Sequence, residues 1–386
     1  MIEHYNSNMK ISRRDFLKYI CASGAMLIAP FLVPFGKIFA IKKDTPTINH
    51  TMEQPELILP QRDPSHNVDL INSMLEYSEN VRLGEGVFNI TPSWQNPGSG
   101  LNFGLQIPKS NTTLEGSGIG KTILRAIQPD MTIISNLHYD TAPAAISGIR
   151  VANLTLDGNK SNNTPILDQS LIRFRKSVNV VYDGIEAING AFVGIACAGI
   201  SRFPDDGDGK NFTISNCISR NCNDNGFDIA SNATITNCMA INNNAGGTTA
   251  NLDFDGADPC LVDGFKSIGG TVGIHIGNPV RPSNNVVIKN DIQNPLQNAI
   301  VVEGTKGAMV LNTHIEMENS YTAIQISKGA SVSKISNVHV LGAGTIDLSE
   351  DSSIIENNNV TSVAGPSVFG YYFESPNKNK PLHQGP

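Results

Sequence analysis

The chain has 386 residues, of which only 16% are charged, and its formal net charge is -7. This length allows one large domain or two ordinary ones, and the negative charge argues against a general nucleic-acid surface. The 35 glycines are typical of many tight turns between short strands. An anionic polysaccharide is not excluded as a substrate, because the local field of a groove can differ in sign from the net charge.

The first 40 residues indicate an export signal. Residues 12–18 read SRRDFLK, a weakly apolar stretch follows, and Ala40 supplies a small residue at the expected cleavage site. This pattern resembles a twin-arginine export signal, with an ordinary secretory signal as the alternative. Pro30 and Pro34 fit poorly into a membrane-spanning helix, so we expect no stable membrane anchor. The resemblance implies the twin-arginine export machinery as a partner and a location in the periplasm or outside the cell.

The rest of the chain divides into three parts. Residues 41–65, with Pro46, Pro55 and Pro60, are expected to form a linker. Residues 66–92 are expected to form a short helix and a first strand that cap the open end of a repeated structure, where strand edges would otherwise be exposed. That repeated structure is expected to occupy residues 66–365, including the cap. Residues 366–386, rich in Pro and Lys, are expected to be a loose tail.

A polar residue recurs at intervals of roughly 20–30 residues, each time after a short strand-like run, which is the mark of a solenoid. We expect its side chain to point inward at a turn and to bond the turn backbone and the next copy. Nine residues form this predicted ladder: Asn153, Asp183, Asn216, Asn237, Asp263, Asn290, Asn312, Asn337 and Asn357.

The ladder resembles that of the right-handed parallel β-helix in the pectin-lyase-like superfamily, over residues 66–365. The resemblance implies an all-β solenoid with an N-terminal cap, and it says nothing about the reaction. The cysteines after the signal, an odd number without a CxxC pair, predict neither a disulfide framework nor a zinc site. Cys217 and Cys238 directly follow ladder residues, so we expect both to be small filler in a stacked core.

The strand-like runs before the ladder read apolar-x-apolar, and side chains alternate across a strand, so the middle residue is expected to face solvent. Aligning these runs places Asp228, Asp253 and His275 in one column on consecutive coils. Asp255 and Glu303 follow two residues further along and share that face. Arg173 and Arg175 are expected below the column, where they would bind substrate.

Two neighbouring carboxylates repel each other and raise one pKa, an arrangement that structure alone does not require. Catalytic sites use it to pair a proton donor with an acceptor. Clustered carboxylates also suit calcium, and solvated surface residues are the third interpretation. A calcium site would use Asp228, Asp253 and Asp255.

The order Asp, two Asp, His on successive coils is similar to the polygalacturonase family. By that resemblance Asp228, Asp253 and Asp255 are the acid and base residues and His275 the fourth catalytic residue. One Asp would protonate the leaving oxygen and another would activate water, and a carboxylate separation of roughly 6.5–9.5 Å would predict inversion.

Three functions therefore stay open. The leading one is an exported glycoside hydrolase that cleaves a polysaccharide, and we expect that polysaccharide to contain uronate. The second is a calcium-dependent polysaccharide lyase or uronate epimerase, with His275, Lys266 or Arg281 as base. The third is a non-catalytic, carbohydrate-binding or adhesive solenoid. Lys266, Arg281 and Glu303 are candidate substrate-binding residues in any of the three.

Overall fold

The computed structural model describes residues 57–97, 100–128, 131–137, 145–160, 170–197, 209–230, 232–243, 250–254, 260–277, 286–303, 306–319, 321–327, 330–342, 345–347 and 361–363. All of them belong to one of the chain's two compact units, Glu53–Pro386. The residues of the expected signal and of the expected tail lie outside the described ranges. Among the described residues no helix is long and apolar enough to cross a membrane.

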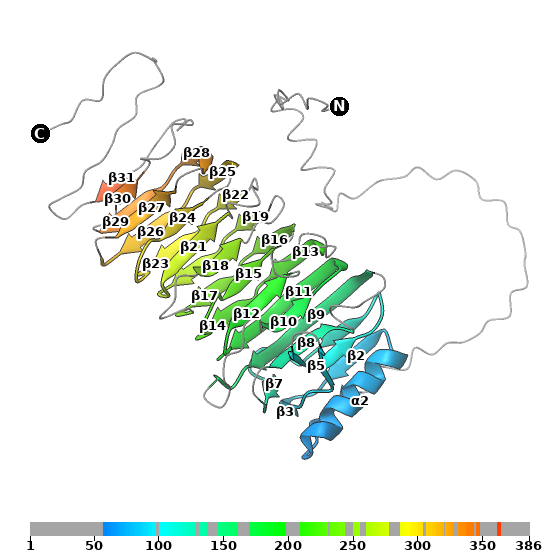
Figure 1. The fold of residues 1–386 in the computed structure, drawn as a ribbon. Helices are drawn as coiled ribbons and strands as arrows, with labels where there is room; N and C mark the ends of the chain where they lie inside the picture. The colour runs from blue at the N-terminus through cyan, green and yellow to red at the C-terminus, as the bar shows by residue number, and fades with distance from the viewer. Residues whose placement is uncertain are drawn as a thin grey trace, which may run out of the picture. The chain divides into compact units, whose positions relative to one another are not determined.

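The described residues are mostly β-strands in two large sheets, and nearly all neighbouring strands are parallel (Figure 1). The 11-stranded sheet, called sheet B, follows chain order from β4 to β30. Its strands are β4 (Trp94–Gln95), β5 (Asn102–Ile107), β8 (Met131–Asn136), β10 (Ser170–Phe174), β12 (Val193–Cys197), β15 (Phe227–Ile229), β18 (Ala250–Phe254), β21 (Val272–Ile276), β24 (Ile300–Val302), β27 (Thr322–Ile326) and β30 (Thr345–Asp347).

The 20-stranded sheet, called sheet A, consists of two rows that the long strands β9 and β11 bridge. Row A1 contains β1 (Leu57–Ile58), β2 (Asn80–Leu83), β6 (Thr113–Glu115), β9 (Ile146–Asp157), β11 (Ser177–Ile188), β13 (Lys210–Ser215), β16 (Ala233–Thr236), β19 (Leu261–Asp263), β22 (Val286–Ile288), β25 (Lys306–Leu311) and β28 (Ser331–Ser336). Row A2 contains β3 (Gly86–Ile90), β7 (Thr122–Ala126), the second halves of β9 and β11, β14 (Ile218–Arg220), β17 (Met239–Ile241), β20 (Lys266–Ile268), β23 (Asp291–Gln293), β26 (His314–Met317), β29 (His339–Gly342) and β31 (Thr361–Val363).

The chain visits sheet B, row A1 and row A2 in turn, and each strand pairs with its counterpart one coil later. For example, β15 pairs with β18, β16 with β19 and β17 with β20, all in parallel. The pair β4–β5 is antiparallel. The predicted all-β class with parallel strands is thus confirmed.

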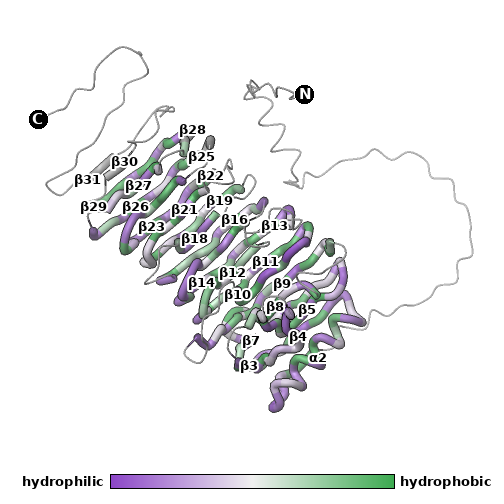
Figure 2. Tube along the Cα trace, in the orientation of Figure 1, coloured by the Kyte–Doolittle hydropathy of each residue, from purple (hydrophilic) through white to green (hydrophobic). Residues whose placement is uncertain are grey.

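The core lies inside the coils and is built from the apolar members of each apolar-x-apolar run. In sheet B every inward residue from Ile172 to Ile324 is fully buried, and hydrophobic and hydrophilic residues alternate along the strands (Figure 2). Burying one such aliphatic side chain stabilises the fold by about 1.5–3 kcal/mol. Stacked apolar pairs therefore hold each coil in register with the next.

The helix α2 (Pro64–Tyr77) packs against β2, β3 and β5. Asp63 caps its start by accepting a hydrogen bond from the Ser65 amide at 3.0 Å, and Pro64 occupies the first turn, where a missing N–H costs nothing. The Asn72 side chain bonds the backbone of β5 through Gly104 and Gln106. A capping helix was predicted, but α2 begins at Pro64 and β1 precedes it at Leu57, both before the expected residue 66.

The predicted ladder exists at the turn between rows A1 and A2, but its chemistry differs from the expectation. Register aligns eight residues there, and all have φ between 49° and 78°: Asn153, Gly184, Asn216, Asn237, Gly264, Lys289, Asn312 and Asn337. Asn and Gly are the residues that adopt this left-handed conformation most readily.

The expectation of inward-pointing ladder side chains holds for Asn290, which is 2% exposed, and is wrong for four other members. Asn216, Asn237, Asn312 and Asn337 are exposed, and Asn337 donates to Asn312 on the surface at 2.9 Å. Asp183, Asp263 and Asn290 stand one position away from the aligned residues, because the polar pattern alone does not separate neighbouring turn positions. Asn357 lies outside the described residues.

The residue after each ladder position fills the interior instead. Cys217 and Cys238 occupy this inner stack, followed by Phe265, Asn290 and Thr313. The predicted packing role of Cys217 and Cys238 is confirmed, and all five described cysteines are buried and outside any disulfide.

Candidate functional site

The register of sheet B brings three predicted residues into one line on its outer face. Asp228 on β15 pairs with Asp253 on β18, which pairs with His275 on β21. The line, here called the outer column, starts at Arg173 and Ala196 before Asp228 and continues to Val301 and Gln325 after His275. The alignment made from the apolar-x-apolar pattern is therefore confirmed residue by residue.

Three residues of this region form a chain of contacts, here called the relay. His275 Nδ1 lies 2.7 Å from Asp253 Oδ1, and His275 Nε2 lies 3.3 Å from Glu303 Oε2. Side-chain exposure rises along the relay from 13% at Asp253 through 25% at His275 to 44% at Glu303. The relay thus runs from a nearly buried carboxylate to one that an incoming ligand can reach.

The backbone of each strand explains why these side chains meet. Asp253 and His275 stand between fully buried residues of β18 and β21, Leu252 and Ile274 among them, so strand alternation turns both outward. Adjacent parallel strands lie about 4.8 Å apart, which brings outward side chains in register within hydrogen-bond reach.

Asn225, which the sequence analysis did not single out, holds the second oxygen of Asp253. Its Nδ2 donates to Asp253 Oδ2 at 3.1 Å, and its Oδ1 accepts from the Ala250 amide at 2.9 Å. Asn225 is 5% exposed, so these bonds are shielded from water. The signal that could have revealed it is Asn298, which stands at the same place in a later coil and makes the same pair of bonds.

The environment of His275 changes its acidity. Burial alone would lower the pKa of His275, but the hydrogen bond and the charge of Asp253, together with Glu303, outweigh burial and raise the pKa above its ordinary value. Both partners are acceptors, so they favour the imidazolium, which has an N–H on each ring nitrogen. The two contacts therefore favour the protonated form of His275.

Asp228 and the two arginines extend the charged surface along the outer column. Asp228 is half-buried and separated from Arg173 by Ala196. Arg173 was expected to face solvent, but it is 3% exposed, and Arg175 is 9% exposed. Strand alternation determines on which face of the sheet a side chain lies. How exposed that side chain is depends on what packs over the face.

The structure does not bring every candidate to the outer column. Lys266 lies on β20 in row A2, where its Nζ is 3.2 Å from Asp291 Oδ2. Asp255 and Arg281 lie outside the described residues. The proposed calcium ligand Asp253 has both oxygens in hydrogen bonds, and within the described ranges no group of three His, Cys, Asp or Glu side chains is arranged to hold a metal.

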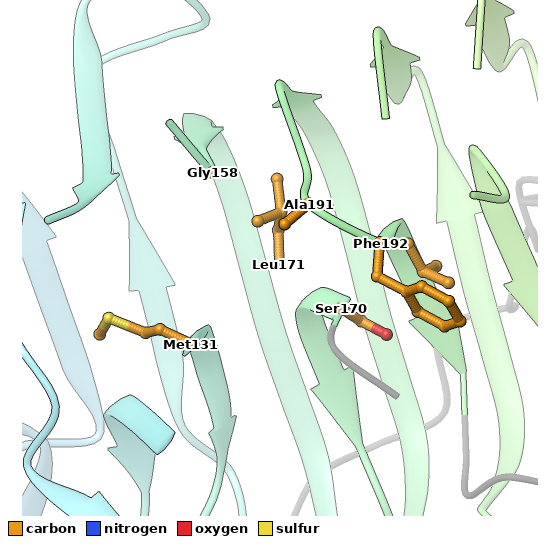
Figure 3. Close-up of a pocket in the computed structure, with 7 residues that line it drawn as sticks. Met131, Gly158, Ser170, Leu171, Ala191 and Phe192 are labelled. Carbon is orange, nitrogen blue, oxygen red and sulfur yellow. The ribbon is translucent and has the colours of Figure 1, made fainter. Parts of the chain in front are cut away.

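A small indentation lies elsewhere, at the starts of β10 and β12 (Figure 3). Leu171, Ala191 and Phe192 are among its lining residues. It contains none of the charged residues of the relay, and its apolar lining offers no acid or base. Of these two places, only the outer face of sheet B gathers acids and bases.

Comparison with known proteins places the fold. No family model matches the chain, and no curated protein matches its sequence significantly. The solved A-module of the mannuronan C-5 epimerase AlgE4 from Azotobacter vinelandii is 14% identical, with a TM-score of 0.52 over 78% of this chain and 93% of that one. An N-terminal fragment of gene product 12 from bacteriophage Phi29 is 16% identical, with a TM-score of 0.54 over 72% of this chain and 55% of that one. At such identities the likeness shows a shared fold.

Proposed function

We propose that this chain is an exported enzyme that acts on a polysaccharide and transfers protons through His275, on a right-handed parallel β-helix. The observation that carries the proposal is the relay, in which both ring nitrogens of His275 contact carboxylates. A histidine that is oriented at one ring nitrogen by a buried carboxylate is a common general acid–base arrangement. The right-handed coil is the hand of nearly all parallel crossovers.

The leading reaction is glycoside hydrolysis. Protonated His275 would give its Nε2 proton to the leaving glycosidic oxygen as the bond from that oxygen to the anomeric carbon breaks. A water molecule would form the new bond to that carbon and lose its proton to Asp228. Asp228 and His275 are two coils apart, about 10 Å along the axis, which leaves room for that water.

These roles revise the expectation from the sequence, in which Asp253 was an acid or base. Asp253 has both oxygens engaged, so its role here is to orient His275. Glu303, the most exposed member of the relay, would release Nε2 to the substrate and bind a sugar hydroxyl. Asp255 and Arg281 stay predictions, because they lie outside the described residues.

A polysaccharide lyase or uronate epimerase is the alternative. Either reaction removes a proton beside a carboxylate and needs a neutral base. The raised pKa of His275 reduces its neutral fraction near pH 7, which favours an acid over a base. Hydrolysis is therefore the better-supported reaction for this histidine.

The test uses the protein without residues 1–40 and a panel of uronate-containing and neutral polysaccharides, with calcium or with a chelator. Reducing ends and ultraviolet absorbance are followed together. Reducing ends without absorbance support hydrolysis, whereas both signals together, lost on chelation, support a calcium-dependent lyase. No product and no epimerised sugar, with retained binding, would overturn the enzyme proposal in favour of a carbohydrate-binding solenoid.

A further inference from the structure

The side-chain amide of Asn225 has only one chemically allowed orientation. The Ala250 amide is a donor, so the Asn225 atom that it meets at 2.9 Å must be the oxygen. The other end of the amide is then the NH₂ group, and it faces Asp253 Oδ2 at 3.1 Å. A backbone donor thus decides an assignment that is otherwise ambiguous for asparagine.

This orientation determines how Asp253 can bond. An NH₂ group donates, so Asp253 Oδ2 must accept, which leaves no proton on that oxygen. Asp253 Oδ1 lies 2.7 Å from His275 Nδ1. A carboxylate can only accept, so the hydrogen of this contact is assigned to Nδ1. The proton that His275 can exchange with a ligand is therefore the one on Nε2.

Asn298, in a later coil, makes the same pair of hydrogen bonds as Asn225. Comparing the two asparagines separates the structural role of these bonds from their effect on His275. Asn298 Oδ1 accepts from the Thr322 amide at 3.1 Å, and Asn298 Nδ2 donates to Gln325 Oε1. Each asparagine thus bonds the next strand's backbone and the next side chain of the outer column. Only the Asn225 copy ends on a carboxylate that touches a histidine.

We propose that Asn225 is a positioning residue of the active site, which fixes the orientation of the Asp253 side chain and thereby directs Nε2 of His275 toward Glu303 and the substrate. The reading of Asn225 as part of an active site rests on the proposed function. The coupling of Asn225 to His275 stands on the contacts alone and can be measured without a substrate.

The experiment compares Asn225→Asp with Asn298→Asp. Each variant retains the oxygen that accepts from the strand backbone and replaces the NH₂ group by an oxygen. At position 298, Gln325 can rotate its own amide and donate, so the bond is restored. At position 225 the new carboxylate faces Asp253 without a proton between them, and like charges repel.

Titration of the His275 ring nitrogens by NMR is the main readout, with a His275→Gln variant to assign the signals. We expect Asn225→Asp to move the His275 titration to higher pH, because a second negative charge stabilises the imidazolium. We expect Asn298→Asp to leave it in place. On an active substrate, Asn225→Asp should lower kcat about a hundredfold with little change in KM, since a misplaced acid affects the chemical step.

A double variant guards against misfolding of Asn225→Asp. In the double variant Asn225→Asp with Asp253→Asn, the donor and the acceptor exchange places, so all the hydrogen bonds can form. The negative charge moves from position 253 to position 225, further from His275. We expect the thermal midpoint to recover and the His275 titration to fall below that of the wild type.

Equal shifts of the His275 titration in Asn225→Asp and Asn298→Asp, or none in either, would reduce Asn225 to a coil-building residue and overturn the proposal. A wild-type protein inactive on every polysaccharide would overturn the proposed function instead. The NMR comparison decides the coupling in that case too, so the two failures are distinguishable.

Discussion

At the scale of single residues, His275 is the group on which the proposed chemistry depends. We expect His275→Gln to lower turnover by about a hundredfold to ten-thousandfold, the usual contribution of a general acid. Asp253→Asn should act in the same direction, because the asparagine no longer supports the imidazolium. Initial rates on the substrate found in the polysaccharide screen measure both effects.

The matched control for this prediction is His339→Gln, the same substitution on β29 in sheet A. It should leave turnover unchanged, and all three variants should unfold within a few degrees of the wild type. Undiminished turnover in His275→Gln would remove the relay from the reaction.

The raised pKa of His275 also predicts how stability depends on pH. A histidine whose pKa is higher in the folded state binds its proton more tightly there. Its contribution to the free energy of unfolding is complete below the ordinary value of about 6.5 and is lost as pH rises through the folded-state pKa. Urea titrations from about pH 6 to about pH 9 should show this loss, and the loss should be smaller in His275→Gln.

The residue scale also shows where sequence reasoning succeeded. The apolar-x-apolar pattern placed Asp228, Asp253 and His275 in one column because the inward apolar residues specify the register of each strand. The spacing of those apolar residues can be read from the sequence. Asn225 was missed because its role depends on a hydrogen bond across coils, which no local pattern encodes. The burial of Arg173 depends on what covers the outer face, which a strand's own sequence does not describe.

At the scale of elements, the turn between rows A1 and A2 is defined by backbone conformation. Asn237 has a φ of 52° and is exposed. It therefore stabilises the turn because asparagine tolerates this left-handed conformation. We expect Asn237→Ala to reduce the free energy of unfolding by about 1 kcal/mol, the cost of a left-handed residue with an ordinary side chain. Denaturant titration measures the change.

Asn237→Gly is the control, because glycine adopts the same conformation without strain. We expect it to stay within about 0.5 kcal/mol of the wild type. If Asn237→Ala and Asn237→Gly lost equal stability, Asn237 would stabilise the turn through hydrogen bonds of its side chain. Its tolerance of the left-handed conformation would then not explain the effect.

The sequence placed the ladder to within one residue, and the discrepancy has a physical cause. A tight turn places one residue in the left-handed region and the next in the interior, and both positions accept asparagine. Lys289 and Asn290 show this, since Lys289 takes the left-handed position and Asn290 is buried. The recurring polar residues therefore locate the turn, but they do not show which residue has the left-handed conformation. Lys266 was misjudged for a related reason, because the short strands of one coil look alike in sequence.

At the scale of the whole molecule, the helix α2 protects the first coil. Leu75 is fully buried there, and we expect Leu75→Ala to cost about 2–5 kcal/mol. In a stacked structure this loss should first affect the neighbouring coils. Hydrogen exchange should therefore show earlier opening of β2, β3 and β5 than of β21.

Tyr77 in the same helix is 83% exposed, and Tyr77→Ala should change the stability by less than about 0.5 kcal/mol. If Leu75→Ala opened all coils together, the coils would unfold as a single cooperative unit.

The relay joins residues far apart along the polypeptide: Asp253 and His275 are 22 positions apart, and His275 and Glu303 are 28. The stacking of one coil on another brings their side chains together, whatever the number of residues between them. An insertion or deletion in the connecting loops would change the sequence intervals and leave the distances between these side chains intact. Evolution could thus remodel these loops freely, while a shift of even one residue within β18 or β21 would turn Asp253 or His275 into the core.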